Sequence, residues 1–147
     1  MADASGFLRI RTPLRYSDGG LVELYVEARS SRLIITDFGE SFRFLRTYGL
    51  DPLRSAVRRN IVDLALELGG ATVDQDALEI AVENAEDLVG ALLRLGQVVT
   101  RVSDLALSAR GALTATFPDT VEEFIRSGAP DVEVKRNEFI DGNATVH

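Results

Sequence analysis

The sequence of 147 residues contains no cysteine and no tryptophan, one methionine and one histidine. Without cysteine the chain cannot form a disulfide framework, a thiolate zinc site, an iron–sulfur cluster or a cysteine nucleophile. Because the one histidine is the last residue, His147, an internal Ser-His-Asp triad, a general-base histidine and a two-histidine metal site are excluded as well. We therefore expect no cofactor, no resident metal and no enzyme activity in this chain as given.

Long apolar runs are also lacking. No run approaches the ~18 residues that a membrane span requires, and the first residues lack the apolar core of a signal peptide. Apolar residues make up 46% of the sequence and charged residues 27%, a composition typical of a chain that folds around a core. We expect a soluble cytoplasmic protein with one domain, or with one domain and the start of another.

Lysine is almost absent, since the basic residues are 15 arginines and the single Lys135. We attribute this bias to genome composition rather than to recognition chemistry. Residues 1–60 hold ten arginines and seven acids, whereas residues 61–147 hold six basic residues and sixteen acids, so the net charges are +3 and −10. Such asymmetry occurs in proteins that bind nucleic acid or a charged partner, but two ordinary solvated faces also produce it, and we favour that interpretation.

Alternating apolar and polar residues predict the strands. Residues 7–12 and 21–28 alternate, and Leu33 to Thr36 form an apolar run of strand length. The turn residues at 17–20 and the short polar link at 29–32 imply an antiparallel meander. Ala77 to Val82 is predicted as a fourth strand.

Apolar residues at helical spacing predict two principal helices, over about 51–68 and 85–108. Asp51-Pro52 begins the first with an N-cap and a first-turn proline, and Gly69-Gly70 ends it. The predicted buried stripe of the first helix is Leu53, Val57, Ile61, Leu64 and Leu68, and that of the second is Leu88, Leu92, Leu95, Val99, Val102 and Ala106. A shorter helix begins at Glu40 or Ser41 and stops at Gly49. The expected fold is α+β, with a mainly antiparallel sheet of three or four strands covered on one face by the two principal helices.

Beyond the α+β domain, the last residues of the chain are predicted to form a connector, a short helix and part of a hairpin. Residues 111–117 are expected to form a connector, residues 120–127 a short helix, and Asn137 to Ile140 with Asp141-Gly142 one arm and the turn of a hairpin. Few residues remain for the return arm, so we expect an unfinished hairpin. We therefore expect an α+β domain over 1–110, and over 111–147 the start of a second domain of a longer protein.

The tripeptide Asp37-Phe38-Gly39 spells the metal-binding motif of protein kinases. No glycine-rich loop, strand lysine or His-Arg-Asp loop accompanies it. We interpret Thr36, Asp37 and Gly39 as a structural turn between a buried strand and a helix, in which the aspartate accepts backbone N–H bonds and the glycine adopts a conformation that other residues resist. From the turn alone, replacing Asp37 by alanine is expected to cost about 1–2 kcal/mol.

The basic residues of the predicted helices form the candidate interaction face, for which nucleic acid or an acidic protein is the expected partner. Helical spacing places the arginines three or four residues apart, on shared faces. The candidate residues are Arg43, Arg46, Arg54, Arg58 and Arg59. Few aromatic residues lie near them to stack on bases, so nucleic acid is the less favoured partner.

The order of segments resembles a known family. Thr12-Pro13 after a strand, the block Ile35-Thr36-Asp37-x-Gly39, the Leu-x-x-x-Gly element at 45–49 and a long Leu/Val helix near 88–105 together resemble domain of unknown function 1828, over about residues 8–107. The resemblance implies a bacterial or phage protein, often from a defence, toxin or regulatory context, and a second uncharacterised domain that begins after about residue 115. It implies no activity, cofactor or catalytic residue.

The leading functional hypothesis is a non-enzymatic module that binds a protein partner. Two alternatives stay open: an accessory N-terminal domain of a nucleic-acid enzyme whose catalytic part lies beyond residue 147, and an acidic inhibitor that imitates nucleic acid. Self-association is open as well.

Overall fold

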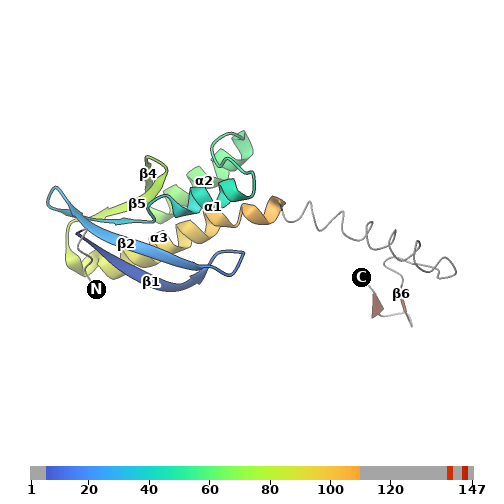
Figure 1. Cartoon of the computed structure of the whole chain (residues 1–147), viewed down its shortest axis with the longest axis horizontal. Coiled ribbons are helices and arrows are strands. Elements are labelled where there is room, and N and C mark those ends of the chain that lie inside the picture. The colour runs from blue at the N-terminus through green and yellow to red at the C-terminus, as the bar shows by residue number, and fades with distance from the viewer. Residues whose placement is uncertain (1–5, 110–138, 141–143, 146–147) are drawn as a thin grey trace. The chain divides into compact units, whose positions relative to one another are not determined.

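The structure is a computed structural model that describes residues 6–109, 139–140 and 144–145 (Figure 1). The chain divides into two compact units, Met1–Ala109 and Arg110–His147, which are described separately. In the second unit, β6 (Phe139–Ile140) pairs with β7 (Ala144–Thr145), so the predicted hairpin does have a return arm. The connector and short helix predicted over 111–127 lie outside the described residues, and the second domain stays a prediction.

The first unit has the predicted α+β fold, built on an antiparallel sheet in the order β1-β2-β3-β5-β4. Its strands are β1 (Phe7–Arg15), β2 (Leu21–Arg29), β3 (Arg32–Thr36), β4 (Thr72–Asp74) and β5 (Ala77–Val82). The sheet has five strands rather than three or four, because β4 was not predicted. At three residues this strand is too short to show an alternating pattern. It reaches β5 through a tight turn at Gln75 and Asp76, which both have positive φ.

Three helices accompany the sheet: α1 (Glu40–Thr47), α2 (Ala56–Gly69) and α3 (Leu88–Ser103). A 3₁₀ turn, η1 (Ala85–Asp87), leads into α3. Helix α3 lies across β1, β2, β3 and β5, while α1 contacts α3 and β5 (Figure 1). The principal contacts of α2 are with α3. Most of the contacts between the helices and the sheet are therefore made by α3, while α2 contributes Val62 and Ala65 to the shared core.

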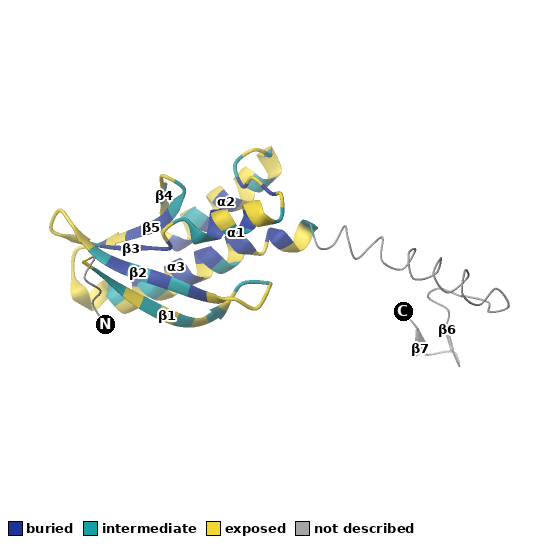
Figure 2. Cartoon of the chain, viewed as in Figure 1, coloured by how far each residue is buried: buried dark blue, intermediate teal, exposed yellow. Residues whose placement is uncertain are grey.

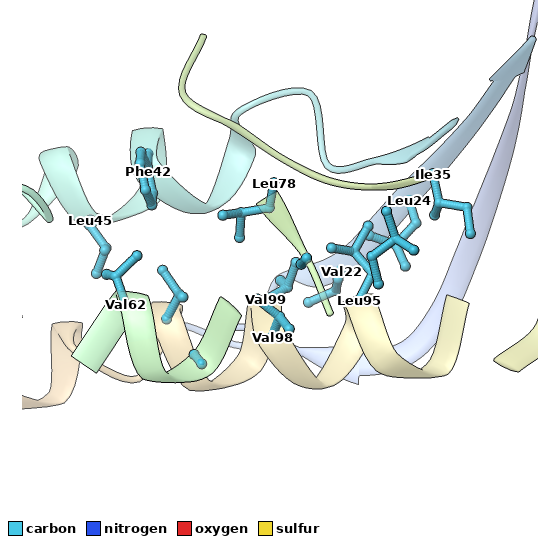
Figure 3. Close-up of a cluster of buried hydrophobic side chains, with 14 of the residues drawn as sticks. Val22, Leu24, Ile35, Phe42, Leu45, Val62, Leu78, Leu95, Val98 and Val99 are labelled. Atoms are coloured by element: carbon cyan, nitrogen blue, oxygen red, sulfur yellow. The ribbon is translucent and has the colours of Figure 1, made fainter. Parts of the chain in front are cut away.

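The core lies between one face of the sheet and the helices (Figure 3). Its fully buried side chains come from β2, β3 and β5 on one side and from all three helices on the other. They include Val22, Leu24, Ile35 and Leu78 from the sheet, Phe42 and Leu45 from α1, Val62 from α2, and Leu95, Val98, Val99 and Val102 from α3. The predicted stripe of the second helix is confirmed from Leu95 onward, while Leu88 and Leu92 at its start are half-buried.

The predicted buried stripe of α2 is wrong. Val57 is 70% exposed, Ile61 40%, Leu64 56% and Leu68 63%, and Leu53 is half-buried in the turn before the helix. Figure 2 colours the helices and strands of this unit by burial class. The face that packs on α3 consists instead of Val62, Ala65 and Gly69. Small residues allow the two helices to approach closely, so packing selects this face over the larger apolar one.

Two valines of α2 test this assignment with the same chemical change. Replacing the buried Val62 by alanine should lower the free energy of unfolding by about 2 kcal/mol, because two core methyl groups are lost. Replacing the exposed Val57 should change it by no more than about 0.5 kcal/mol. Urea denaturation of both variants measures the difference, and a larger loss for Val57→Ala would restore the face predicted from the sequence.

Candidate protein-interaction surface

Asp37 joins the end of β3 to α1 and to β5. Its side chain is fully buried and accepts three backbone hydrogen bonds: Oδ1 from the N–H groups of Gly39 at 2.9 Å and Leu78 at 2.8 Å, and Oδ2 from that of Ser41 at 3.0 Å. Thr36 Oγ1 accepts the N–H of Phe38 at 3.0 Å. Gly39 has φ +79°, which favours glycine.

These contacts give the Thr36-Asp37-Gly39 block a sufficient structural explanation. Both carboxylate oxygens of Asp37 already accept protein N–H groups, as the turn hypothesis expects. Among the described residues, no group of three or more histidine, cysteine, aspartate or glutamate side chains is placed to hold a metal ion. In the same part of the chain, no helix has the length and apolar character needed to cross a membrane.

The first two arginines of the candidate face lie on α1 and form ion pairs within the chain. Arg43 pairs with Glu40 one turn earlier. Arg46 Nη1 donates to Asp76 Oδ2 in the β4–β5 turn at 2.9 Å, and this hydrogen bond raises the pKa of Arg46. The charge of each guanidinium is therefore partly compensated before any partner arrives.

The remaining arginines lie around the start of α2. Arg58 Nη1 donates to the carbonyl of Asp51 at 3.1 Å, and Arg59 Nη2 donates to that of Leu53 at 2.6 Å. Arg54 is exposed in the turn before the helix. Four of the five candidate arginines thus bind acceptors of the chain itself, two of them carboxylates and two of them backbone carbonyls. The candidate interaction face stays a prediction.

The exposed apolar stripe of α2 was predicted to face the core. Val57, Ile61, Leu64 and Leu68 follow one another at steps of four, three and four. This is the spacing of the seam in a coiled coil, where a second helix covers the row. The signal was present in the sequence, but periodicity does not reveal what lies against an apolar stripe.

A groove lies beside the stripe. It has a volume of about 320 Å³ and runs between α2 and α3. Its lining consists of Ile61, Leu64, Ala65, Leu68, Arg101 and Asp104. The floor is apolar and the α3 side supplies one charge of each sign, the arrangement of an apolar centre with a polar rim that protein interfaces have. We define the stripe and this groove together as the α2 face.

Comparison with protein-family models identifies the chain. Residues 12–102 match the family described as "Domain of unknown function DUF1828". The chain belongs to this family. The resemblance noted in the sequence is thereby confirmed over nearly the same range. No curated protein and no solved structure matches the chain.

A second apolar groove in this DUF1828 domain lies between β1 and the amino-terminal part of α3. Its volume is also about 320 Å³. The lining residues are Ile10, Arg11, Thr12, Pro13, Leu14, Val89, Leu92, Leu93 and Gln97. Val89 and Leu93 are each 66% exposed, so they provide an exposed apolar pair that is separate from the α2 face.

The open face of the DUF1828 sheet carries charges of both signs. Arg29 forms two hydrogen bonds of 3.1 Å with the buried Glu79, and these bonds raise the pKa of Arg29. The rings of Phe7, Tyr25 and Phe38 cluster nearby, with Tyr25 and Phe38 centroids 4.6 Å apart. Neither group was predicted from the sequence, because strand pairing brings its members together from distant segments.

Proposed function

We propose that this DUF1828 chain is a non-enzymatic protein-interaction module that binds a protein partner through the α2 face. The proposal includes the setting that the family resemblance implies, a bacterial or phage protein with a defence, toxin or regulatory role. The observation that carries the proposal is the exposure of Val57, Ile61, Leu64 and Leu68 at coiled-coil spacing. Single exposed apolar residues are ordinary, but a contiguous row on one helix face beside an apolar groove is typical of a surface that another helix covers.

The nucleic-acid alternative has less support. A phosphate-binding surface needs guanidinium or ammonium groups that are free to neutralise phosphates. Arg43 and Arg46 instead face Glu40 and Asp76, and the open face of the sheet pairs Arg29 with Glu79. No observation singles out the acidic-inhibitor alternative.

Labelling of introduced cysteines tests the proposed function, because the chain has no cysteine of its own. In Leu64→Cys the thiol lies on the α2 face, while in Asp63→Cys it lies on the same helix outside the stripe. We expect a maleimide to label Leu64→Cys about fivefold more slowly in host-cell extract that contains the chain at about 100 μM than in the dilute purified chain, since a bound partner excludes the reagent.

The Asp63→Cys variant is the control and should react at the same rate in both samples. Equal labelling rates for Leu64→Cys in extract and in dilute solution would mean that nothing occupies the α2 face in the cell. That outcome would refute the proposed function.

A further inference from the structure

We infer that the partner of the α2 face is a second copy of this chain, with the two α2 helices packed antiparallel around a twofold axis. This inference rests on the proposed function and names its partner. The axis would pass between Ile61 and Leu64. Because the stripe has the symmetric spacing four, three, four, an antiparallel copy brings Val57 opposite Leu68 and Ile61 opposite Leu64, so every exposed apolar side chain of the row meets another one.

The charges of α2 select the antiparallel direction. Beside the stripe, the amino-terminal part of the helix carries Arg58, with Arg54 just before it, whereas the carboxyl-terminal part carries Glu67. In an antiparallel pair the basic part of each helix lies alongside the acidic part of the other. A parallel pair would place like charges together, and antiparallel helix dipoles also attract each other.

The groove provides room for the contact. It lies directly against the stripe, since Ile61, Leu64 and Leu68 contribute to both. In coiled-coil packing each apolar side chain enters a space formed by the facing helix. Here α3 supplies one wall of that space, with Arg101 and Asp104 at its edge, so the partner helix contacts two helices instead of one.

The size of this contact determines its strength. A helix of 14 residues is about 21 Å long, so two crossing copies bury an area at the lower end of specific interfaces. We therefore expect a reversible dimer with a dissociation constant of about 10 μM, a value associated with weak or transient assemblies.

Sedimentation velocity of the full chain between about 1 and 300 μM tests self-association. The unmodified chain should shift from monomer to dimer over this range. Leu64→Glu/Leu68→Glu should remain monomeric throughout, which corresponds to at least about 30-fold weaker association. The matched control Val89→Glu/Leu93→Glu makes the same change on equally exposed residues in the groove beside β1, and it should dimerise like the unmodified chain. Thermal unfolding of both variants verifies that they fold.

Cross-linking tests the direction of the helices. Val57→Cys and Leu68→Cys chains are mixed and oxidised at a concentration where the dimer forms, and the cysteine-free background limits the products to the two introduced thiols. An antiparallel dimer should give disulfides between the two variants, and little product from either variant alone.

Three results of the sedimentation and cross-linking experiments would overturn the inference. The first is a chain that stays monomeric to 300 μM, and the second is a dimer that survives Leu64→Glu/Leu68→Glu. The third is a disulfide that joins Val57→Cys to itself in preference to Leu68→Cys. A monomeric chain whose Leu64→Cys thiol is nevertheless protected in cell extract would refute only the second-copy partner and leave the proposed function in place. Protection in the purified chain that is independent of concentration would show that the chain covers its own α2 face, and would refute both.

Discussion

Replacement of Asp37 by alanine is expected to lower the free energy of unfolding by about 4 kcal/mol. The substitution removes the acceptor of three backbone N–H groups, those of Gly39, Ser41 and Leu78. Each buried donor left without a partner costs about 1–3 kcal/mol. The expected loss exceeds the 1–2 kcal/mol anticipated from the sequence, because a local turn explains the bonds to Gly39 and Ser41 but not the bond to Leu78, 41 residues away.

Two further variants test whether the lost hydrogen bonds cause this loss of stability. Asp37→Asn keeps one carbonyl oxygen for Gly39 and Leu78 but places an NH₂ group against the N–H of Ser41, so about half of the loss is expected. Asp18 Oδ1 accepts the N–H of Gly20 at 2.8 Å in an exposed turn, and Asp18→Ala should cost less than about 1 kcal/mol. Urea denaturation measures all three variants. A loss for Asp37→Ala no larger than that for Asp18→Ala would contradict the structural role proposed for this turn.

Replacement of Gly69 by alanine has the second largest expected effect, a loss of about 3 kcal/mol. A Cβ atom at Gly69 would lie 2.2 Å from Cγ2 of Val98 on α3. Val98 is buried and β-branched, so it cannot easily turn aside, and the two helices must move apart.

The Gly69→Ala/Val98→Ala double variant tests this mechanism. Removing Cγ2 of Val98 makes room for the new methyl group, so the double variant should lose at least about 1 kcal/mol less than the sum of the two single losses. Gly70→Ala is the matched control, because a Cβ there meets nothing within 4 Å. Gly70 has φ +65°, and the strain of that conformation should cost about 1 kcal/mol with no relief from Val98→Ala. Strictly additive losses for Gly69 and Val98 would exclude the close contact as the cause.

Of the adjacent glycines at 69 and 70, the structural role of one was predictable from the sequence and that of the other was not. The pair was predicted to end a helix, and Gly70 does so at positive φ. Nothing in the sequence indicates that Gly69 lies against α3, since the close approach of α2 to α3 depends on where each helix lies. The three strands of the meander, by contrast, have local signals, because their residues alternate and short turns join them.

The α2 helix shows which features follow from the local sequence and which depend on tertiary packing. Its existence and its apolar stripe are properties of the local sequence. The side that faces the core is a property of the whole packing, and the helix uses Val62 and Ala65 for it instead of the larger residues of the stripe. The partners of the candidate arginines were unpredictable for the same reason, since Asp76 reaches Arg46 across 30 residues.

The hydrogen bond between Asp37 and Leu78 also constrains the order in which the chain can fold. During synthesis the first three strands and α1 leave the ribosome well before Leu78 does. Until β5 arrives beside β3, the carboxylate of Asp37 lacks one of its buried partners, and the outer edge of β3 has no neighbour. The amino-terminal meander is therefore an incomplete folding unit, and the strand that completes it also fixes the start of α1. Closing so long a loop costs chain entropy, and only the contacts of the assembled core offset that cost. The Asp37 turn, the pairing of β3 with β5 and α1 should therefore form in one cooperative step.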